Sequence, residues 1–291
     1  MCGVDRLAGE VGFCGEDSRL RAARASLHLW EEPCLVGKRG SGTVFFTGCS
    51  LGCVYCQNRP ISHEGVGKAI SAKELADTFL SLQEAGAANI NLVTATPHLP
   101  RVAEALLLAK AAGLSLPVVY NTSGYERIES LALLRGLVDV YLPDLKTLSR
   151  RRAERYMGAP DYPEVARAAI RFMVDEVGAP VFDGEGRMTR GVIVRHLVLP
   201  RGEADALHVL RHLATYGNDI YVSLMSQYTP IGQCEDYPEL ARPLSRAVYD
   251  RLVGEALLLG MEQVYIQEAG CVSESFIPAF DGAGLVCGEN A

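Results

Sequence analysis

The most constraining feature of the sequence is a set of three cysteines, Cys49, Cys53 and Cys56, that fall within eight residues. Their spacing is C-x3-C-x2-C, and the apolar residues 44–46 lie shortly before them. Thiolate sulfur suits iron–sulfur clusters and zinc, so a loop that gathers three thiolates predicts a metal centre. A four-iron cluster has four corners and a tetrahedral zinc site has four positions, so three cysteines leave one open. An open position on a metal favours catalysis over a purely structural role.

Two simpler interpretations of the same cysteines stay open at this point. They could form a structural zinc knuckle, or they could be buried thiols that act as small apolar side chains. A zinc knuckle usually pairs one C-x2-C with a second such pair or with two histidines at a distance. The sequence shows no second compact pair. A binding module for zinc or an iron–sulfur cluster, without catalysis, remains an alternative.

Composition limits the class of protein. The chain has 291 residues, 48% of them hydrophobic and 22% charged, which suits one large core without disulfides. Its nine cysteines are odd in number and scattered, a poor fit to a disulfide framework. The net charge of −7 argues against nucleic-acid binding. Residues 1–20 show no signal peptide and no apolar run is long enough to span a membrane, so we expect a cytoplasmic protein.

Strand and helix patterns alternate after the cysteines. Strands are expected at 44–46, 89–94, 117–120, 138–142, 191–199, 219–224 and 263–267, and helices at 71–85, 98–112, 126–134, 148–177, 204–216 and 243–259. Ser71 and Glu74 form a capping-box pattern at the first of these helices. Apolar strands that alternate with helices predict a parallel sheet covered on both faces, as a partial α/β barrel or a doubly wound open sheet. Residues 1–42 are expected to be an N-terminal extension, with a helix-to-turn passage near 27–30, and residues 43–291 the core domain.

Polar residues follow the expected strands, at the edge where α/β proteins bind ligands. They are found in the cysteine loop and in residues 94–98, 121–124, 143–146, 195–196 and 226–230. One such segment would be ordinary loop chemistry. Six in register predict a shared site.

The cysteine motif, with Tyr55 as the aromatic residue before Cys56, resembles that of the radical S-adenosylmethionine (SAM) superfamily. The strand ends are most similar to the branch that activates glycyl radical enzymes, such as pyruvate formate-lyase activating enzyme. The resemblance implies an α/β fold with a partial (β/α)6 TIM-type barrel of parallel strands, plus the N-terminal extension. It implies a [4Fe–4S] cluster on Cys49, Cys53 and Cys56, and SAM bound by residues at the strand ends. These residues would be Tyr55, Thr94, Thr96, Asn121, Thr122, Ser123, Asp144, Lys146 and His196.

Some of these assignments depart from the branch. Thr94-Ala95-Thr96-Pro97 stands where the branch has Gly-Gly-Glu, so the hydroxyls of Thr94 and Thr96 would replace its acidic partner. The Asp144-Leu145-Lys146 segment matches the Asp-x-Lys motif of the branch. By this resemblance Lys146 would hold SAM or a product carboxylate, and Asp144 could coordinate a monovalent cation. Simple alternatives are a buried core histidine for His196 and a surface ion pair for Asp144 and Lys146.

A still closer resemblance is to a group of activase-like radical SAM proteins. It rests on residues 40–43 (Gly-Ser-Gly-Thr), 56–58 (Cys-Gln-Asn) and 226–228 (Ser-Gln-Tyr). Such proteins usually begin with a further cysteine-rich segment, of which Cys2 and Cys14 remain here. The start of the chain could therefore be shorter or misplaced, and a second metal site on Cys2 and Cys14 stays open. The other cysteines, Cys34, Cys234, Cys271 and Cys287, are expected to be plain thiols.

The resemblance implies an enzyme that cleaves SAM reductively to a 5′-deoxyadenosyl radical, with an external one-electron donor of the flavodoxin or ferredoxin type. Its target would be a glycyl radical enzyme or similar protein. A small molecule or peptide is the alternative target. No nucleic-acid or membrane partner is expected.

Overall fold

The computed structural model describes residues 3–230, 236–267 and 278–288. Its strands are β1 (Arg21–His28), β2 (Ser41–Phe46), β3 (Lys68–Ala69), β4 (Ile90–Val93), β5 (Val118–Thr122), β6 (Val140–Pro143), β7 (Val181–Phe182), β8 (Met188–Leu197), β9 (Tyr221–Met225) and β10 (Val264–Ile266). Its α-helices are α1 (Pro33–Val36), α2 (Arg59–Ser62), α3 (Ala72–Glu84), α4 (Leu99–Ala111), α5 (Ile128–Leu131), α6 (Arg150–Met157), α7 (Tyr162–Val177), α8 (Glu203–Ala214) and α9 (Arg246–Leu258).

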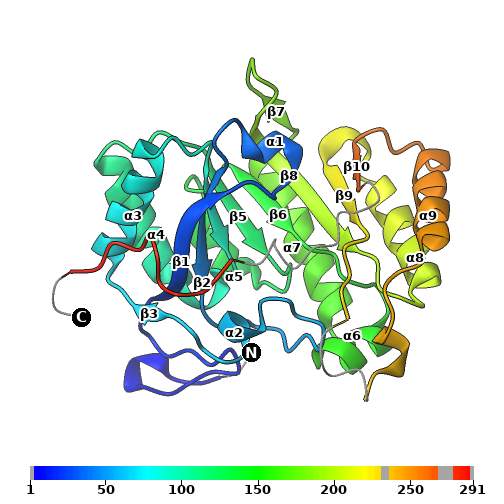
Figure 1. Cartoon of the computed structure of the whole chain (residues 1–291), viewed down its shortest axis with the longest axis horizontal. Coiled ribbons are helices and arrows are strands. Elements are labelled where there is room, and N and C mark those ends of the chain that lie inside the picture. The colour runs from blue at the N-terminus through cyan, green and yellow to red at the C-terminus, as the bar shows by residue number, and fades with distance from the viewer. Residues whose placement is uncertain (1–2, 231–235, 268–277, 289–291) are drawn as a thin grey trace.

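The strands of the described residues form one curved sheet in the order β10-β9-β8-β6-β5-β4-β2-β1-β3, and β7 pairs with β8 outside this order (Figure 1). Neighbours from β2 to β10 are parallel, whereas β1 and β3 join at one edge as antiparallel strands. The parallel strands follow chain order without the reversal that defines a doubly wound sheet. The prediction of a partial α/β barrel with parallel strands is therefore confirmed, and the doubly wound alternative is wrong.

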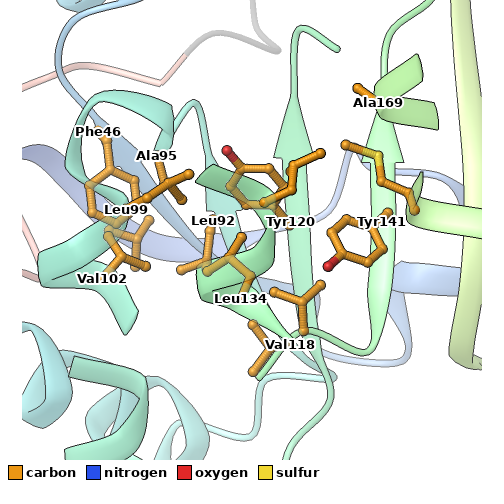
Figure 2. Close-up of a cluster of buried hydrophobic side chains, with 14 of the residues drawn as sticks. Phe46, Leu92, Ala95, Leu99, Val102, Val118, Tyr120, Leu134, Tyr141 and Ala169 are labelled. Carbon is orange, nitrogen blue, oxygen red and sulfur yellow. The ribbon is translucent and has the colours of Figure 1, made fainter. Parts of the chain in front are cut away.

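The large apolar core lies between the outer face of the sheet and the helices (Figure 2). Side chains alternate between faces along each strand, so Leu92 and Tyr120 point outward. There they belong to the same cluster as Leu99 and Val102 of helix α4. Helices α3 and α4 lie toward one end of the sheet and α8 and α9 toward the other (Figure 1).

The inner face of the sheet has smaller apolar clusters. One joins Leu35 of α1 to Val119, Val140 and Ile193. Another joins Phe45 and Val93 to Ile61 of α2. These clusters fill part of the concave side of the partial barrel and leave the carboxyl ends of the parallel strands facing a cavity.

Most predicted elements are present with boundaries that differ by a few residues. The capping box at Ser71 forms as predicted, and Glu74 accepts from the Ser71 backbone N–H at 2.7 Å. The interrupted helix is also confirmed, because α6 ends at Gly158, whose φ of 65° places it in the left-handed region.

The predicted helix-to-turn passage near residues 27–30 is wrong. Residues up to His28 belong to β1, which pairs with β2 along its whole length. The alanines of this segment favour helix locally, and the hydrogen bonds to β2 override that preference. The proposed boundary between residues 42 and 43 falls inside β2. The division into an extension and a core stays a prediction.

Within the described ranges, no helix is both long and apolar enough to cross a membrane.

Candidate functional site

A cavity of about 980 Å³ opens at the carboxyl ends of the parallel strands. Residues from β2, β4, β5, β6, β8, β9 and β10, or from the loops that follow them, line it. Cavities that bind small molecules usually measure roughly 300–1,000 Å³. The cavity therefore has room for a ligand the size of a nucleoside derivative.

The cysteine loop forms one wall of this cavity. Cys49, Cys53 and Cys56 all line it, and the loop starts at Gly48, which has a φ of 76°. A Cβ atom at Gly48 would lie 2.5 Å from the side chain of Glu16, so only glycine fits there. The other side of the loop is bound to helix α6, since the Val54 N–H donates to Tyr156 O at 2.9 Å.

The chemistry of the three thiols fits a metal cluster. All three are free of disulfides, and burial raises the pKa of the Cys49 thiol to about 12 and that of Cys53 still further. A buried thiol exists as thiolate at neutral pH when a cation compensates its charge, and iron does so directly. Within the described ranges, no three His, Cys, Asp or Glu side chains meet the geometry of a site for one metal ion. A four-iron cluster instead holds its cysteines on separate corners.

Two atoms beside the cysteines could tune such a cluster. The Leu51 N–H donates to Cys49 Sγ at 3.4 Å, and Ser62 Oγ lies 3.2 Å from Cys56 Sγ. Hydrogen bonds to cluster sulfurs shift reduction potentials. Tyr55 also lines the cavity, and its buried ring meets that of Tyr156 edge to face, with centroids 6.5 Å apart.

A charged network lies beside the cysteine loop. Lys146 Nζ donates to Asp144 Oδ2 at 2.6 Å, and Arg195 Nε donates to Asp144 Oδ1 at 3.0 Å. Arg195 Nη2 also donates to Asn121 Oδ1 at 2.6 Å. Burial alone would raise the pKa of Asp144, but the charges of Lys146 and Arg195 outweigh it and hold that pKa below its ordinary value. The network keeps Asp144 ionised at neutral pH.

The same network argues against the monovalent cation expected beside Asp144. Both carboxylate oxygens already pair with cationic side chains. A metal cation there would compete with the Lys146 ammonium and the Arg195 guanidinium for the same carboxylate. The simple surface-pair interpretation of Asp144 and Lys146 is wrong as well, because both line the cavity and their side chains are less than 20% exposed.

The structure brings most of the predicted site residues to this cavity. Besides the cysteines and Tyr55, the predicted residues on its wall are Thr94, Asn121, Thr122, Ser123, Asp144 and Lys146. Thr94 takes a left-handed φ of 59°, a conformation that costs about 1–3 kcal/mol outside glycine and is found mostly at functional sites. That these residues contact SAM stays a prediction.

Two predicted residues, Thr96 and His196, lie outside the cavity wall. The Thr96 hydroxyl donates to Glu126 Oε1 at 2.6 Å, so a buried carboxylate takes the hydrogen bond expected for SAM. His196 is buried, with its Nδ1 atom 2.7 Å from Leu145 O. Side chains alternate along β8, so Arg195 faces the cavity and its neighbour His196 faces the helices.

Three charged residues of the cavity were not among the predicted site residues: Arg195, Glu31 and Glu32. Arg195 could have been chosen in place of His196 if it had been known which residues of β8 face the cavity. Glu31 and Glu32 lie between β1 and α1, in the segment expected to be an extension. No motif marked these two glutamates in the sequence.

The cysteines outside the loop differ in their surroundings. Cys34 is buried and Cys287 exposed, and neither lines the cavity. Cys14 is buried and accepts from Arg6 Nη2 at 2.9 Å. Cys2, Cys234 and Cys271 lie outside the described residues, so a second metal site on Cys2 and Cys14 stays a prediction.

Comparisons with known proteins bear on this site. Residues 43–185, which include the three cysteines, match the family model of the radical SAM superfamily. This part of the chain is similar to radical SAM proteins. An uncharacterised protein of Methanocaldococcus jannaschii is 29% identical over 277 residues, covering 91% of this chain and 74% of the relative. The match to this family model supports an enzyme and implies a [4Fe–4S] cluster, SAM and an electron donor.

Solved structures resemble this chain in fold. The crystal structure of methylornithine synthase matches with a TM-score of 0.51 at 16% identity, over 73% of this chain and 59% of that one. HydG, a maturase of the [FeFe]-hydrogenase, matches with a TM-score of 0.50 at 15% identity, over 74% and 48%. This chain thus spans less than two thirds of either protein. A domain of pyruvate-formate lyase-activating enzyme from Bacteroides vulgatus has a TM-score of 0.44 at 14% identity, over 60% and 93%.

Proposed function

We propose that the protein holds a [4Fe–4S] cluster on Cys49, Cys53 and Cys56 and cleaves SAM reductively at the remaining iron. The observation that carries this proposal is that the three thiols line the same cavity as the polar ends of the parallel strands. A ligand in that cavity can reach the cysteine loop and the strand ends at once. When bound, the cluster would supply one electron to the sulfonium of SAM and so release a 5′-deoxyadenosyl radical.

The residues of the chain would orient SAM. Lys146 and Arg195 are fixed by Asp144 and present positive charge, which suits the carboxylate of SAM. Thr94 and Ser123 lie on the same wall and can donate to its polar groups, whereas the Thr122 hydroxyl already donates to Glu126 Oε1. Ground-state positioning of this kind is the contribution that a protein makes to cofactor chemistry.

The target that we propose is a glycine residue of a partner protein, as in the activation of glycyl radical enzymes. Its support is the Asp144-Leu145-Lys146 motif, with Asp144 and Lys146 on the cavity wall next to the cysteine loop. An activating enzyme would have to admit a peptide loop to the cavity. Incubation with candidate partner proteins under anaerobic conditions tests this target, with electron paramagnetic resonance as the measurement. A glycyl radical doublet on a partner supports it, and turnover of a small molecule or peptide alone overturns it.

Substitution of a loop cysteine tests the cluster. In Cys53→Ala we expect loss of the broad iron–sulfur absorbance after anaerobic reconstitution, because one iron corner loses its ligand. We also expect loss of methionine and 5′-deoxyadenosine formation with dithionite and SAM. The matched control is Cys34→Ala, which removes an equally buried thiol away from the cavity and should keep both signals.

Two results would contradict the cluster proposal. One is a Cys53→Ala protein that still cleaves SAM. The other is a wild-type protein that binds zinc or a cluster but has no affinity for SAM, which would establish the non-catalytic module in its place.

A further inference from the structure

The cavity contains a second polar region, formed by Glu31 and Glu32 of the segment between β1 and α1. The cysteine loop follows β2, whereas these glutamates precede it and belong to a different wall. They take no part in the SAM contacts proposed above. Two acidic side chains therefore lie side by side in the chain on the cavity wall.

A row of alternating charges connects the two regions. It runs from Lys146 to Asp144 at 2.6 Å, then from Asp144 to Arg195 at 3.0 Å. Arg195 Nη1 lies 3.9 Å from Glu31 Oε2, which adds a fourth member. In this row each acidic side chain lies beside a basic one.

Glu32 breaks the alternation. Its side chain is only 7% exposed, and its Oε2 atom has no hydrogen-bond partner among the described residues. It stands at the N-cap position of α1 but makes no side-chain capping bond. The neighbouring cation, Arg195, already donates to Asp144 and Asn121. Glu32 Oε2 is therefore a buried carboxylate oxygen without a donor in the part of the chain that the structure describes.

A buried carboxylate oxygen without a donor is unfavourable, and proteins avoid it by pairing the group or by shifting its pKa. The second effect is visible at Glu31. Burial, followed by the charge of Glu32, raises the pKa of Glu31 to about 8, although Arg195 opposes the shift. A cation beside the two glutamates would be favourable, because it would supply a donor to Glu32 Oε2 and reduce the repulsion between the two side chains.

We propose that Glu31 and Glu32 bind a positively charged nitrogen group of the substrate, an ammonium or a guanidinium. Such a group continues the alternating row and supplies the donors that Glu32 lacks. Trp30 and Tyr265 also line the cavity, and aromatic rings attract cations. This inference rests on the proposed function, because it identifies the substrate whose C–H bond the SAM-derived radical would attack.

Binding of small cations tests the proposal. The probes are butylammonium, methylguanidinium and N-acetyl-lysine methylamide, each added to the cluster-loaded protein with SAM and followed by isothermal titration calorimetry. The neutral comparison is butanol. We expect saturable binding of at least one cation and none of butanol. Preference for the lysine derivative would indicate a protein or peptide substrate, and preference for the free amine or guanidinium a small molecule.

Charge-removing variants locate the site. In Glu32→Gln we expect binding about thirtyfold weaker or more, the effect of removing one partner of a buried charge pair. Glu32→Asp keeps the charge and should retain part of the binding. The control is Glu129→Gln, which removes the same charge from an exposed side chain and should bind like the wild type. Thermal unfolding checks that each variant is folded.

The outcomes separate this inference from the function on which it rests. SAM cleavage by the wild type without any added cation tests the proposed function by itself. Equal affinity of wild type and Glu32→Gln for every cation, or equal binding of butanol, would overturn the inference even if SAM is cleaved. Absence of SAM cleavage in the wild type would overturn the proposed function, whatever the cations do.

Discussion

At the scale of single residues, Asp144 shows how one side chain organises the candidate site. It accepts from Lys146 with one oxygen and from Arg195 with the other, and Tyr162 donates to its backbone carbonyl at 2.9 Å. The two cations are held apart at fixed positions on the wall as a result. A ligand that carries a carboxylate therefore binds to donors that folding has already ordered. Because little further ordering is needed on binding, its affinity improves.

Glu31 makes a pH-dependent contribution to stability. The groups that face it are Glu32 from its own segment, Arg195 from β8, Asp144 after β6 and Asn91 from β4. With its pKa raised to about 8 from an ordinary value of 4.5, folded Glu31 keeps a proton that the unfolded chain loses. Its contribution is complete below pH 4.5 and is lost as the pH rises toward 8.

Glu31→Gln should therefore gain stability relative to the wild type as the pH rises. We expect the difference in free energy of unfolding between the two proteins to change by at most about 1.4 kcal/mol per pH unit between pH 5 and 8. Urea unfolding of both proteins in the same cluster-loaded state measures it. Parallel stability curves over this range would contradict the assignment.

At the scale of elements, β8 shows that one residue step separates a cavity side chain from a core side chain. Arg195 and His196 are neighbours, yet one joins the charged network and the other bonds Leu145 O behind the sheet. Period-two alternation requires this separation. An assignment by resemblance to a motif names the strand correctly and can still choose the wrong face.

Helix α3 offers an element whose start is encoded locally. Its capping box satisfies the first-turn N–H of Glu74, which donates to Ser71 Oγ at 3.1 Å. Ser71→Ala should lower the free energy of unfolding by about 1 kcal/mol. Ser81→Ala, on the exposed face of the same helix, should change it little or raise it slightly, because alanine is the better helix former. Chemical denaturation compares the two, and equal losses would show that capping is not the cause.

At the scale of the whole molecule, residues 278–288 hydrogen-bond to β1, far away in the sequence. The Ala25 N–H of β1 donates to Ala283 O at 2.9 Å, and the Gly282 N–H donates to Ala23 O at 2.8 Å. These bonds lie on the side of β1 that β2 does not occupy, beyond the short pairing with β3. The C-terminal segment therefore covers part of the free edge of the sheet.

Gly284 is the residue that permits this approach. A Cβ atom there would lie 2.0 Å from Ala25 O, and the φ of Gly284 is 75°. Gly284→Ala should cost about 1–3 kcal/mol of stability and detach the segment, with faster proteolysis of the C-terminus. The control is Gly254→Ala in α9, where the Cβ meets open space and alanine should stabilise by about 0.5–1 kcal/mol. Unchanged proteolysis in Gly284→Ala would contradict the predicted contact.

The sequence by itself determined the features that depend on neighbouring residues. Helix and strand periods predicted the parallel strands and their helices, and the spacing of Cys49, Cys53 and Cys56 predicts a metal-binding loop, whose three cysteines line the cavity. Only the tertiary structure decided which polar residues meet in the cavity. Arg195 rather than His196 faces inward because of strand parity, and Glu31 and Glu32 arrive there because β1 pairs with β2. Such placements depend on hydrogen bonds between distant segments, which no local pattern records.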